Sequence, residues 1–173
     1  MPPPPNVAAD LLDKAKTALR YMRQSIEGAI PRLAGEATNV AYMDAWWGEQ
    51  PMWRRYAFSS WSQLPLGLKR VLAPPVPADW FGRVAIHRNF QCANHTEPKL
   101  FLAFRLDRHG NEFQFNKIHL ASERDCCRTC LSDTVRAVMA IQALRELAGG
   151  ANCPFIVIEA WSDRVAYAHE ILG

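Results

Sequence analysis

The sequence predicts an α/β fold in which a mixed sheet is flanked by helices, with a helical, tryptophan-rich region towards the N-terminus. Apolar residues recur at helical spacing from Leu11 to Ile30. After residue 95, segments of strand composition alternate with segments of helical periodicity. The chain has 173 residues, 49% of them hydrophobic, which is enough to bury an apolar core.

Local patterns place the individual elements. Pro98 just inside a segment and Gly110 just after it favour a helix between them, although the alternating leucines of that segment also suit a strand. From His95 onwards the order is helix, strand, helix, strand, helix, which predicts a largely parallel sheet. We expect helices over 11–30, 64–73, 98–106, 127–147 and 165–172, and strands over 83–90, 111–122 and 155–158.

Prolines divide the chain. A run of four prolines marks an extended tail over residues 1–6, and the segment Pro74–Pro77 marks a boundary. We therefore expect an N-terminal helical and aromatic region at 7–77 and a core at 78–173. Its aromatic rings either pack a small helical subdomain or, interleaved with Arg54 and Arg55, stack on single-stranded bases.

Composition excludes some classes of protein. The net charge of +3 permits a nucleic-acid partner without requiring one. The sequence has no run of about 18 apolar residues and no basic and apolar leader at its start, so we expect neither a transmembrane segment nor a secretory signal. Of five cysteines, three fall within five residues, which suits a metal site or a reduced, cytoplasmic compartment better than a disulfide framework.

Two short motifs carry the chemistry. His95-Thr96-Glu97 is followed by Cys127-x-x-Cys130, each at a predicted helix start. One imidazole and two thiolates suit Zn²⁺ and leave its fourth position open for water. Glu97 is too close in sequence to His95 to be a natural fourth ligand and is placed to transfer protons. A closed Cys3His site that adds Cys92 is the alternative, and it would make the protein a non-enzymatic binding module.

This spacing resembles the zinc-dependent nucleic-acid and nucleoside deaminases, which share H-x-E followed by P-C-x-x-C. The segments HTEPKLFLAF and LASERDCCRTCLSDTVRAV are most similar to the bacterial toxin-type branch, and the resemblance covers roughly residues 80–173. It implies that His95, Cys127 and Cys130 bind Zn²⁺ and that Glu97 is catalytic. Cys126 stands where the family usually has proline.

The resemblance also implies how a base would be held. Main-chain groups of Thr96 and Asp125 match those that contact the base in the family. An asparagine well upstream of the histidine often helps to hold the substrate, whereas Asn89 and Asn94 lie close to His95. The family core normally begins with a helix and a two-stranded hairpin, so at least one of these early elements must come from the tryptophan-rich region.

By this resemblance the expected activity is deamination of cytosine to uracil in single-stranded nucleic acid, with DNA favoured over RNA. Scattered arginines and the aromatic-rich region favour a polymer over a free nucleoside, which remains an alternative substrate. A toxin domain of this kind would be delivered into a target cell and would be bound by an immunity protein.

Overall fold

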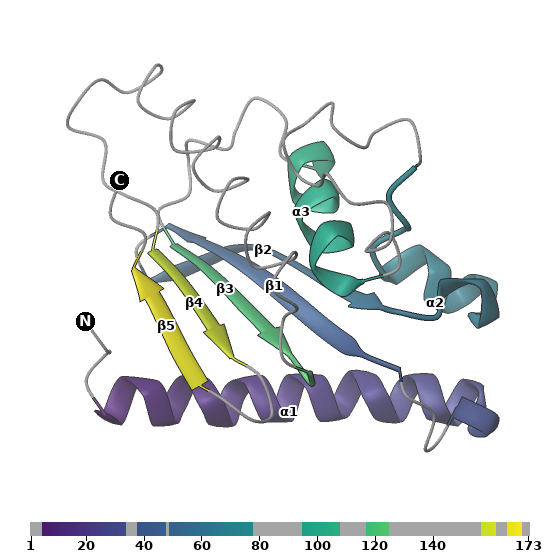
Figure 1. Ribbon diagram of the computed structural model, residues 1–173, viewed down its shortest axis with the longest axis horizontal. Helices are drawn as coiled ribbons and strands as arrows, with labels where there is room; N and C mark the ends of the chain where they lie inside the picture. The colour runs from purple at the N-terminus through teal and green to yellow at the C-terminus, as the bar shows by residue number, and fades with distance from the viewer. Residues whose placement is uncertain are drawn as a thin grey trace.

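A computed structural model describes residues 5–33, 38–47, 49–77, 95–107, 117–124, 157–161 and 166–170, with side chains described from residue 13 and up to residue 124. The architecture is a mixed α/β fold. Five strands form one sheet in the order β2-β1-β3-β4-β5, and helices lie on both of its faces (Figure 1). Among the described residues, none of the helices is sufficiently long and apolar to cross a membrane.

The N-terminal helix α1 spans Pro5–Ala29, as the apolar periodicity predicts. Its buried residues are three or four positions apart and pack against one face of the sheet. The same apolar spacing therefore favours the helix and supplies the surface that packs. A short 3-10 helix, Pro31–Leu33, follows it. The buried stripe consists of Ala15, Leu19, Met22, Ile26 and Ile30.

A β-hairpin occupies the segment for which we expected a helical subdomain. β1 is Val40–Trp47 and β2 is Gln50–Phe58, paired antiparallel with a register shift between Ala45 and Trp46. Residues 40–45 of β1 are all buried, because even positions face α1 and odd positions face the opposite helix layer. A strand covered on both faces loses the polar alternation that identifies strands in sequence. The expectation of a small helical subdomain in this region is therefore wrong for residues 40–47 and 50–58.

The aromatic residues of this hairpin take part in packing. Trp53 meets the ring of Phe104 edge-on at 5.2 Å and donates its indole N–H to Asp107 at 2.9 Å. Trp46 lies 5.4 Å from the His119 ring, between centroids. Packing is thus the role that the described contacts give to these two tryptophans.

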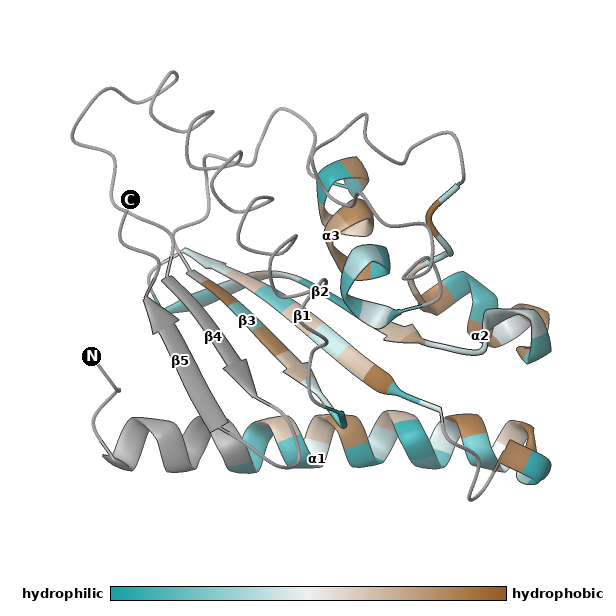
Figure 2. Ribbon diagram, in the orientation of Figure 1, coloured by the Kyte–Doolittle hydropathy of each residue, from teal (hydrophilic) through white to brown (hydrophobic). Residues whose placement is uncertain are grey.

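The chain then leads to the helix on the other face. A 3-10 helix, Trp61–Gln63, and the short helix α2, Leu66–Val71, agree with the helix expected over 64–73. Helix α3, Thr96–Asp107, confirms the helix expected over 98–106. Its residues 96–104 are all buried, which explains why the sequence there shows no clear helical stripe. Figure 2 shows apolar residues concentrated along β1, β3 and α3.

The remaining strands complete the sheet. β3 is Lys117–Ser122, within the strand expected over 111–122, and β4 is Val157–Trp161, overlapping the one expected over 155–158. β3 pairs with β4 in parallel, but β1 with β2, β1 with β3 and β4 with β5 are all antiparallel. The expectation of a largely parallel sheet is therefore wrong, because a tight hairpin and the last strand each reverse the chain direction.

The last element also differs from expectation. Residues 166–170 form strand β5, Ala166–Glu170, where we expected a helix over 165–172. Ala160 of β4 lies opposite Tyr167, so the segment closes the edge beside β4. Apolar runs this short fit both helical and strand periods, and pairing with a neighbouring strand decides between them. The strand expected over 83–90 and the helix expected over 127–147 lie outside the described residues.

Candidate active site

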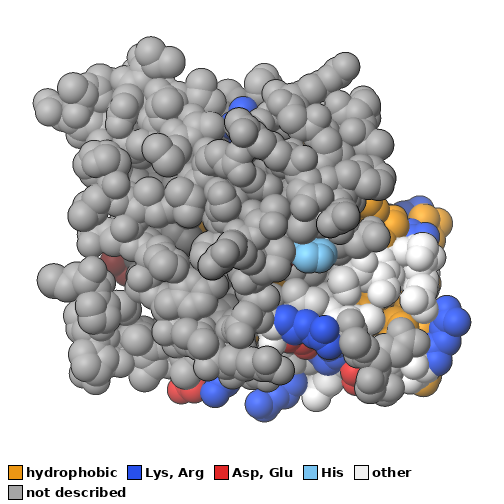
Figure 3. All heavy atoms as spheres, viewed as in Figure 1, with side chains coloured by type: hydrophobic (Ala, Val, Ile, Leu, Met, Phe, Trp, Pro, Cys, Tyr) orange, Lys and Arg blue, Asp and Glu red, His pale blue; other side chains and the backbone are white. Residues whose placement is uncertain are grey.

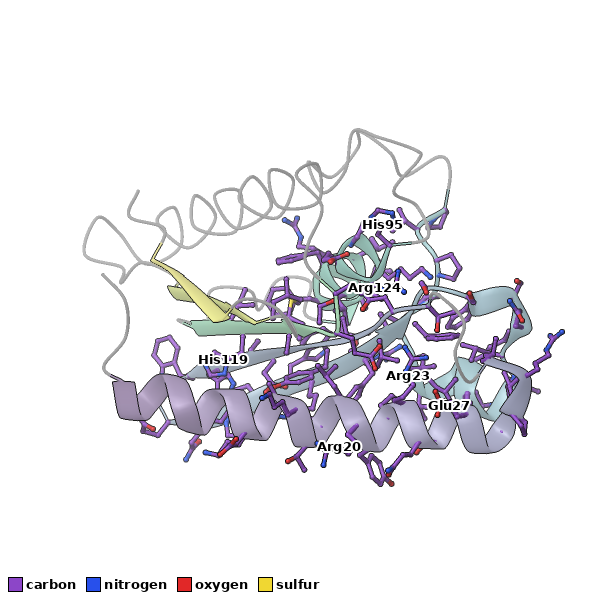
Figure 4. The ribbon with its side chains drawn as sticks, turned by 60° about the horizontal axis from the view of Figure 1, so that its bottom comes forward. Arg20, Arg23, Glu27, His95, His119 and Arg124 are labelled. Atoms are coloured by element: carbon purple, nitrogen blue, oxygen red, sulfur yellow. The ribbon has the colours of Figure 1, made fainter. Side chains whose placement is uncertain are left out.

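The motif His95-Thr96-Glu97 lies where several elements meet at one end of the strands of the sheet. α3 begins at Thr96, directly after His95, while β1 begins and both β2 and β3 end at this same end of the sheet. Figure 4 shows the labelled His95 at the start of α3 and Arg124 close to the same helix. The topology therefore brings chain segments from three distant parts of the sequence to the motif.

The first turn of α3 holds a buried acid. Glu97 is 4% exposed and Thr96 is fully buried. The Thr96 hydroxyl lies 3.3 Å from Oε2 of Glu97, within reach to donate a hydrogen bond. A carboxylate in the first helical turn is also favoured by the amide dipoles of the helix. Glu97 is thus held in a defined position, shielded from bulk water, as a proton-transfer group requires.

Asn39, the residue before β1, connects the motif to the end of β3. Its side-chain amide donates to the hydroxyls of Thr96 and Ser122, both at 2.9 Å. Its side-chain carbonyl accepts the Ser122 hydroxyl and the backbone N–H of Arg124, both at 3.2 Å. One side chain therefore links the residue beside Glu97 to the segment that leads into Cys127.

The backbone of Asn39 is held as firmly as its side chain. Its N–H donates to the Ser59 hydroxyl at 2.9 Å, and its carbonyl accepts the Ser59 N–H at 3.0 Å. Sequence reasoning missed Asn39 because the hairpin that follows it was not predicted. A polar Thr38-Asn39 pair directly before the apolar run from Val40 is the sequence feature that marks a strand start there.

An ion pair fixes the chain on both sides of Asn39. Arg23 of α1 forms a two-point salt bridge with Glu123, whose other contact is the backbone N–H of Val40 at 2.8 Å. The same guanidinium donates to the Thr38 hydroxyl at 2.8 Å and to its carbonyl at 3.2 Å. The hydrogen bond that Arg23 donates to Glu123 raises the pKa of Arg23, so the guanidinium stays charged. Figure 4 shows Arg23 directed from α1 towards the sheet.

A buried lysine holds the end of β2. Lys99 of α3 is fully buried and donates from Nζ to the carbonyls of Phe58 and Ser59, at 2.8 and 3.2 Å. Burial lowers the pKa of Lys99 to about 8. At neutral pH the ammonium form still predominates and supplies donors to both carbonyls.

The structure brings together part of the predicted site. His95, Thr96 and Glu97 are adjacent at the start of α3. The other predicted site residues, Asn89, Asn94, Asp125, Cys127 and Cys130, lie outside the described residues. Both cysteines are among these residues. Within the described part of the chain, no cluster of three or more His, Cys, Asp or Glu side chains could hold a metal ion.

Comparison of the chain with protein-family models, with curated protein sequences and with solved structures finds no match. The chemical argument therefore rests on the residues themselves. The described site offers a buried carboxylate, an imidazole two residues before it in sequence and an amide side chain that is fixed by four hydrogen bonds.

Proposed function

We propose that this protein is a zinc-dependent hydrolytic deaminase that converts cytosine to uracil in single-stranded nucleic acid, with DNA favoured over RNA. The observation that carries the proposal is the pair of hydrogen bonds from Asn39 to Thr96 and from Arg124 to Asn39. They place the segment before the second motif beside the first motif.

A simple reach argument supports the meeting of the two motifs. Cys127 is three residues after Arg124, and an extended chain spans at most about 3.5 Å per residue. Cys127 is therefore within about 10 Å of a backbone position that is itself hydrogen-bonded through Asn39 to Thr96. Thr96 and Arg124 are about thirty residues apart in sequence, and their shared hydrogen bonds to Asn39 bring these two residues together.

The donor types fit zinc. His95 supplies an imidazole in the described site, and the chain supplies thiols at Cys127 and Cys130. Together they would hold Zn²⁺ with three protein ligands, as in catalytic sites that keep a fourth position open. Zinc, when bound, would act as a Lewis acid that lowers the pKa of water and so provides a nucleophile at neutral pH.

The residues of the chain would carry the proton transfers and the orientation of the base. Water adds at C4 of cytosine, ammonia leaves, and uracil is the product. Glu97 would accept a proton from the water and deliver protons to the ring nitrogen and to the departing amine. The Asn39 side chain already makes four hydrogen bonds, so its role would be to position Thr96 and the segment before Cys127. Asn89 and Asn94 remain the predicted substrate-holding residues.

The arrangement of the described elements supports a deaminase-like fold. In the resembled family, a helix and a two-stranded hairpin precede the helix that carries H-x-E. Here α1, the β1–β2 hairpin and then α3 follow one another in that order. The closed Cys3His alternative would require a β-hairpin over 98–122, but α3 and β3 occupy the described parts of that segment.

A polymer substrate is supported by charge at the site. Arg124 is exposed and its backbone N–H donates to Asn39, so an exposed basic residue follows the end of β3 at the site. A phosphate next to the target base would find a partner there. Figure 3 shows other basic side chains interspersed with acidic ones along the visible edge of the described surface. On the part of the surface that is described and visible there, the basic side chains do not form a continuous stripe. A toxin role and an immunity partner remain predictions from the resemblance.

The test is conversion of cytosine to uracil in single-stranded DNA, single-stranded RNA and free cytidine by the zinc-loaded protein. Glu97→Gln should lose nearly all activity while keeping zinc and fold, since it removes the proton carrier and preserves side-chain volume. Glu49→Gln, at the exposed hairpin turn, is the matched control and should keep full activity. Retention of activity in Glu97→Gln, or no uracil from any of the three substrates with the wild-type protein, would refute the proposal.

A further inference from the structure

Lys99 is a buried cation whose partners are neutral. Its side chain is fully buried, and among the described residues no acidic side chain lies within salt-bridge distance of Nζ. The ammonium instead donates to the backbone carbonyls of Phe58 and Ser59. Both acceptors lie at the end of β2, whereas Lys99 itself is in the first turn and a half of α3.

Packing alone does not account for a lysine at this position. An ionised group without a counter-charge is unfavourable in an apolar interior, where leucine or methionine would fill the same space without desolvation. Its neighbours in α3, Leu100 and Phe101, are buried hydrophobic residues of the core. The lysine therefore points to a requirement for the two hydrogen bonds that it makes.

These hydrogen bonds lead to the proposed site through one residue. Ser59, whose carbonyl accepts from Lys99, donates its N–H to the Asn39 carbonyl and accepts the Asn39 N–H on its hydroxyl. Asn39 in turn donates to Thr96, three residues before Lys99 in the same helix. The contacts form a closed ring that starts and ends on α3.

We propose that Lys99 is a positioning residue that fixes Ser59, and through it Asn39, relative to Glu97. This inference rests on the proposed function, in which Asn39 positions Thr96 beside Glu97 and Glu97 transfers protons. Glu97 is in the same first turns of α3 as Lys99. Lys99 thus links α3, which carries Glu97, to Ser59, which is hydrogen-bonded to the backbone of Asn39.

The first test is a double-mutant cycle on deaminase activity. Lys99→Met keeps the apolar stem and removes the donors, and it should lower kcat/KM by about 10- to 100-fold, the effect of a misplaced group in the active site. In an Asn39→Ala background the same substitution should lower kcat/KM by less than about threefold, because the residue it positions is already gone. Equal losses in both backgrounds would overturn the proposal.

A second variant separates positioning from folding. Ser59→Ala removes the acceptor for the Asn39 N–H and leaves the buried lysine intact. It should reduce kcat/KM in the same direction, and its effect should not add to that of Lys99→Met. Should Lys99→Met not fold, Ser59→Ala with full activity would overturn the proposal, and a Ser59→Ala loss that disappears in the Asn39→Ala background would support it.

Amide hydrogen exchange provides a readout that does not depend on activity. In Lys99→Met the Ser59 N–H, which donates to Asn39, should exchange at least about tenfold faster than in the wild-type protein. The Ala73 N–H, which donates to the Tyr56 carbonyl at 2.7 Å, is the internal control and should not change. Unchanged exchange at Ser59 would overturn the proposal. Faster exchange at Ser59 in Lys99→Met, together with no deaminase activity in the wild-type protein, would refute the proposed function and support the structural link.

Discussion

Replacing Arg23 by methionine should destabilise the protein by about 3 kcal/mol. The guanidinium makes two contacts with Glu123 and two with Thr38, so its loss leaves a carboxylate and a carbonyl without their main partners. Charged hydrogen bonds contribute roughly 1.5–3 kcal/mol each when buried. The side chains of Arg23 and Glu123 are 18% and 24% exposed, so water would compensate for part of the loss and the four contacts would not add.

Urea unfolding measures this free energy directly. For a domain of this size, about 3 kcal/mol corresponds to a fall in Tm of roughly 6–12 °C. Arg20→Met is the matched control, because Arg20 is exposed on the same helix, away from the sheet in Figure 4, and its loss should change stability by less than about 0.5 kcal/mol. A loss for Arg23→Met no larger than that of the control would refute the assigned role of the ion pair.

Three further results are expected. Arg54→Met should lower the free energy of unfolding by about 2 kcal/mol, because the carboxylate of Asp44, which is 1% exposed and 2.7 Å from the guanidinium, loses its partner. Adding Asp44→Asn should restore much of the loss, and no restoration would contradict this interpretation. The free energy of unfolding of the wild-type protein relative to Lys99→Met should rise by about 1 kcal/mol from pH 7 to 9, because the folded chain releases the Lys99 proton near a pKa of about 8 and the unfolded chain only near 10.5. A fall over this range would contradict burial as the cause of the lowered pKa of Lys99. Arg124→Ala should reduce the salt dependence of KM for single-stranded DNA by about 0.7 in log–log slope and leave free cytidine unaffected, and equal effects on both substrates would exclude a phosphate contact.

Much of the fold was predictable where local pattern and packing agree. α1 has a one-sided apolar stripe from Ala15 to Ile30, and the helix boundaries of α3 follow from Pro98 and Gly110. The hairpin was missed because β1 is buried on both faces and its aromatic residues fit either period. β5 was missed because its conformation depends on pairing with β4, which no local pattern records.

The candidate site divides in the same way. The H-x-E motif was found because its three residues are contiguous and their chemistry is specific. Asn39 was missed because it lies 56 residues before His95 and reaches the motif only through the pairing of β1 with β2 and β3. Lys99 carried no sequence feature of interest, since only the fold reveals that it is buried against the end of β2.

The central claim is that H-x-E and C-x-x-C together form one open zinc site. Measuring zinc content tests this claim most directly. Purified Cys127→Ser and Cys92→Ser proteins would be compared with the wild-type protein by metal analysis and by uracil formation. We predict one zinc per chain in the wild-type and Cys92→Ser proteins, both active, and loss of zinc and activity in Cys127→Ser. Zinc loss in Cys92→Ser as well would contradict the open site and favour a closed Cys3His centre.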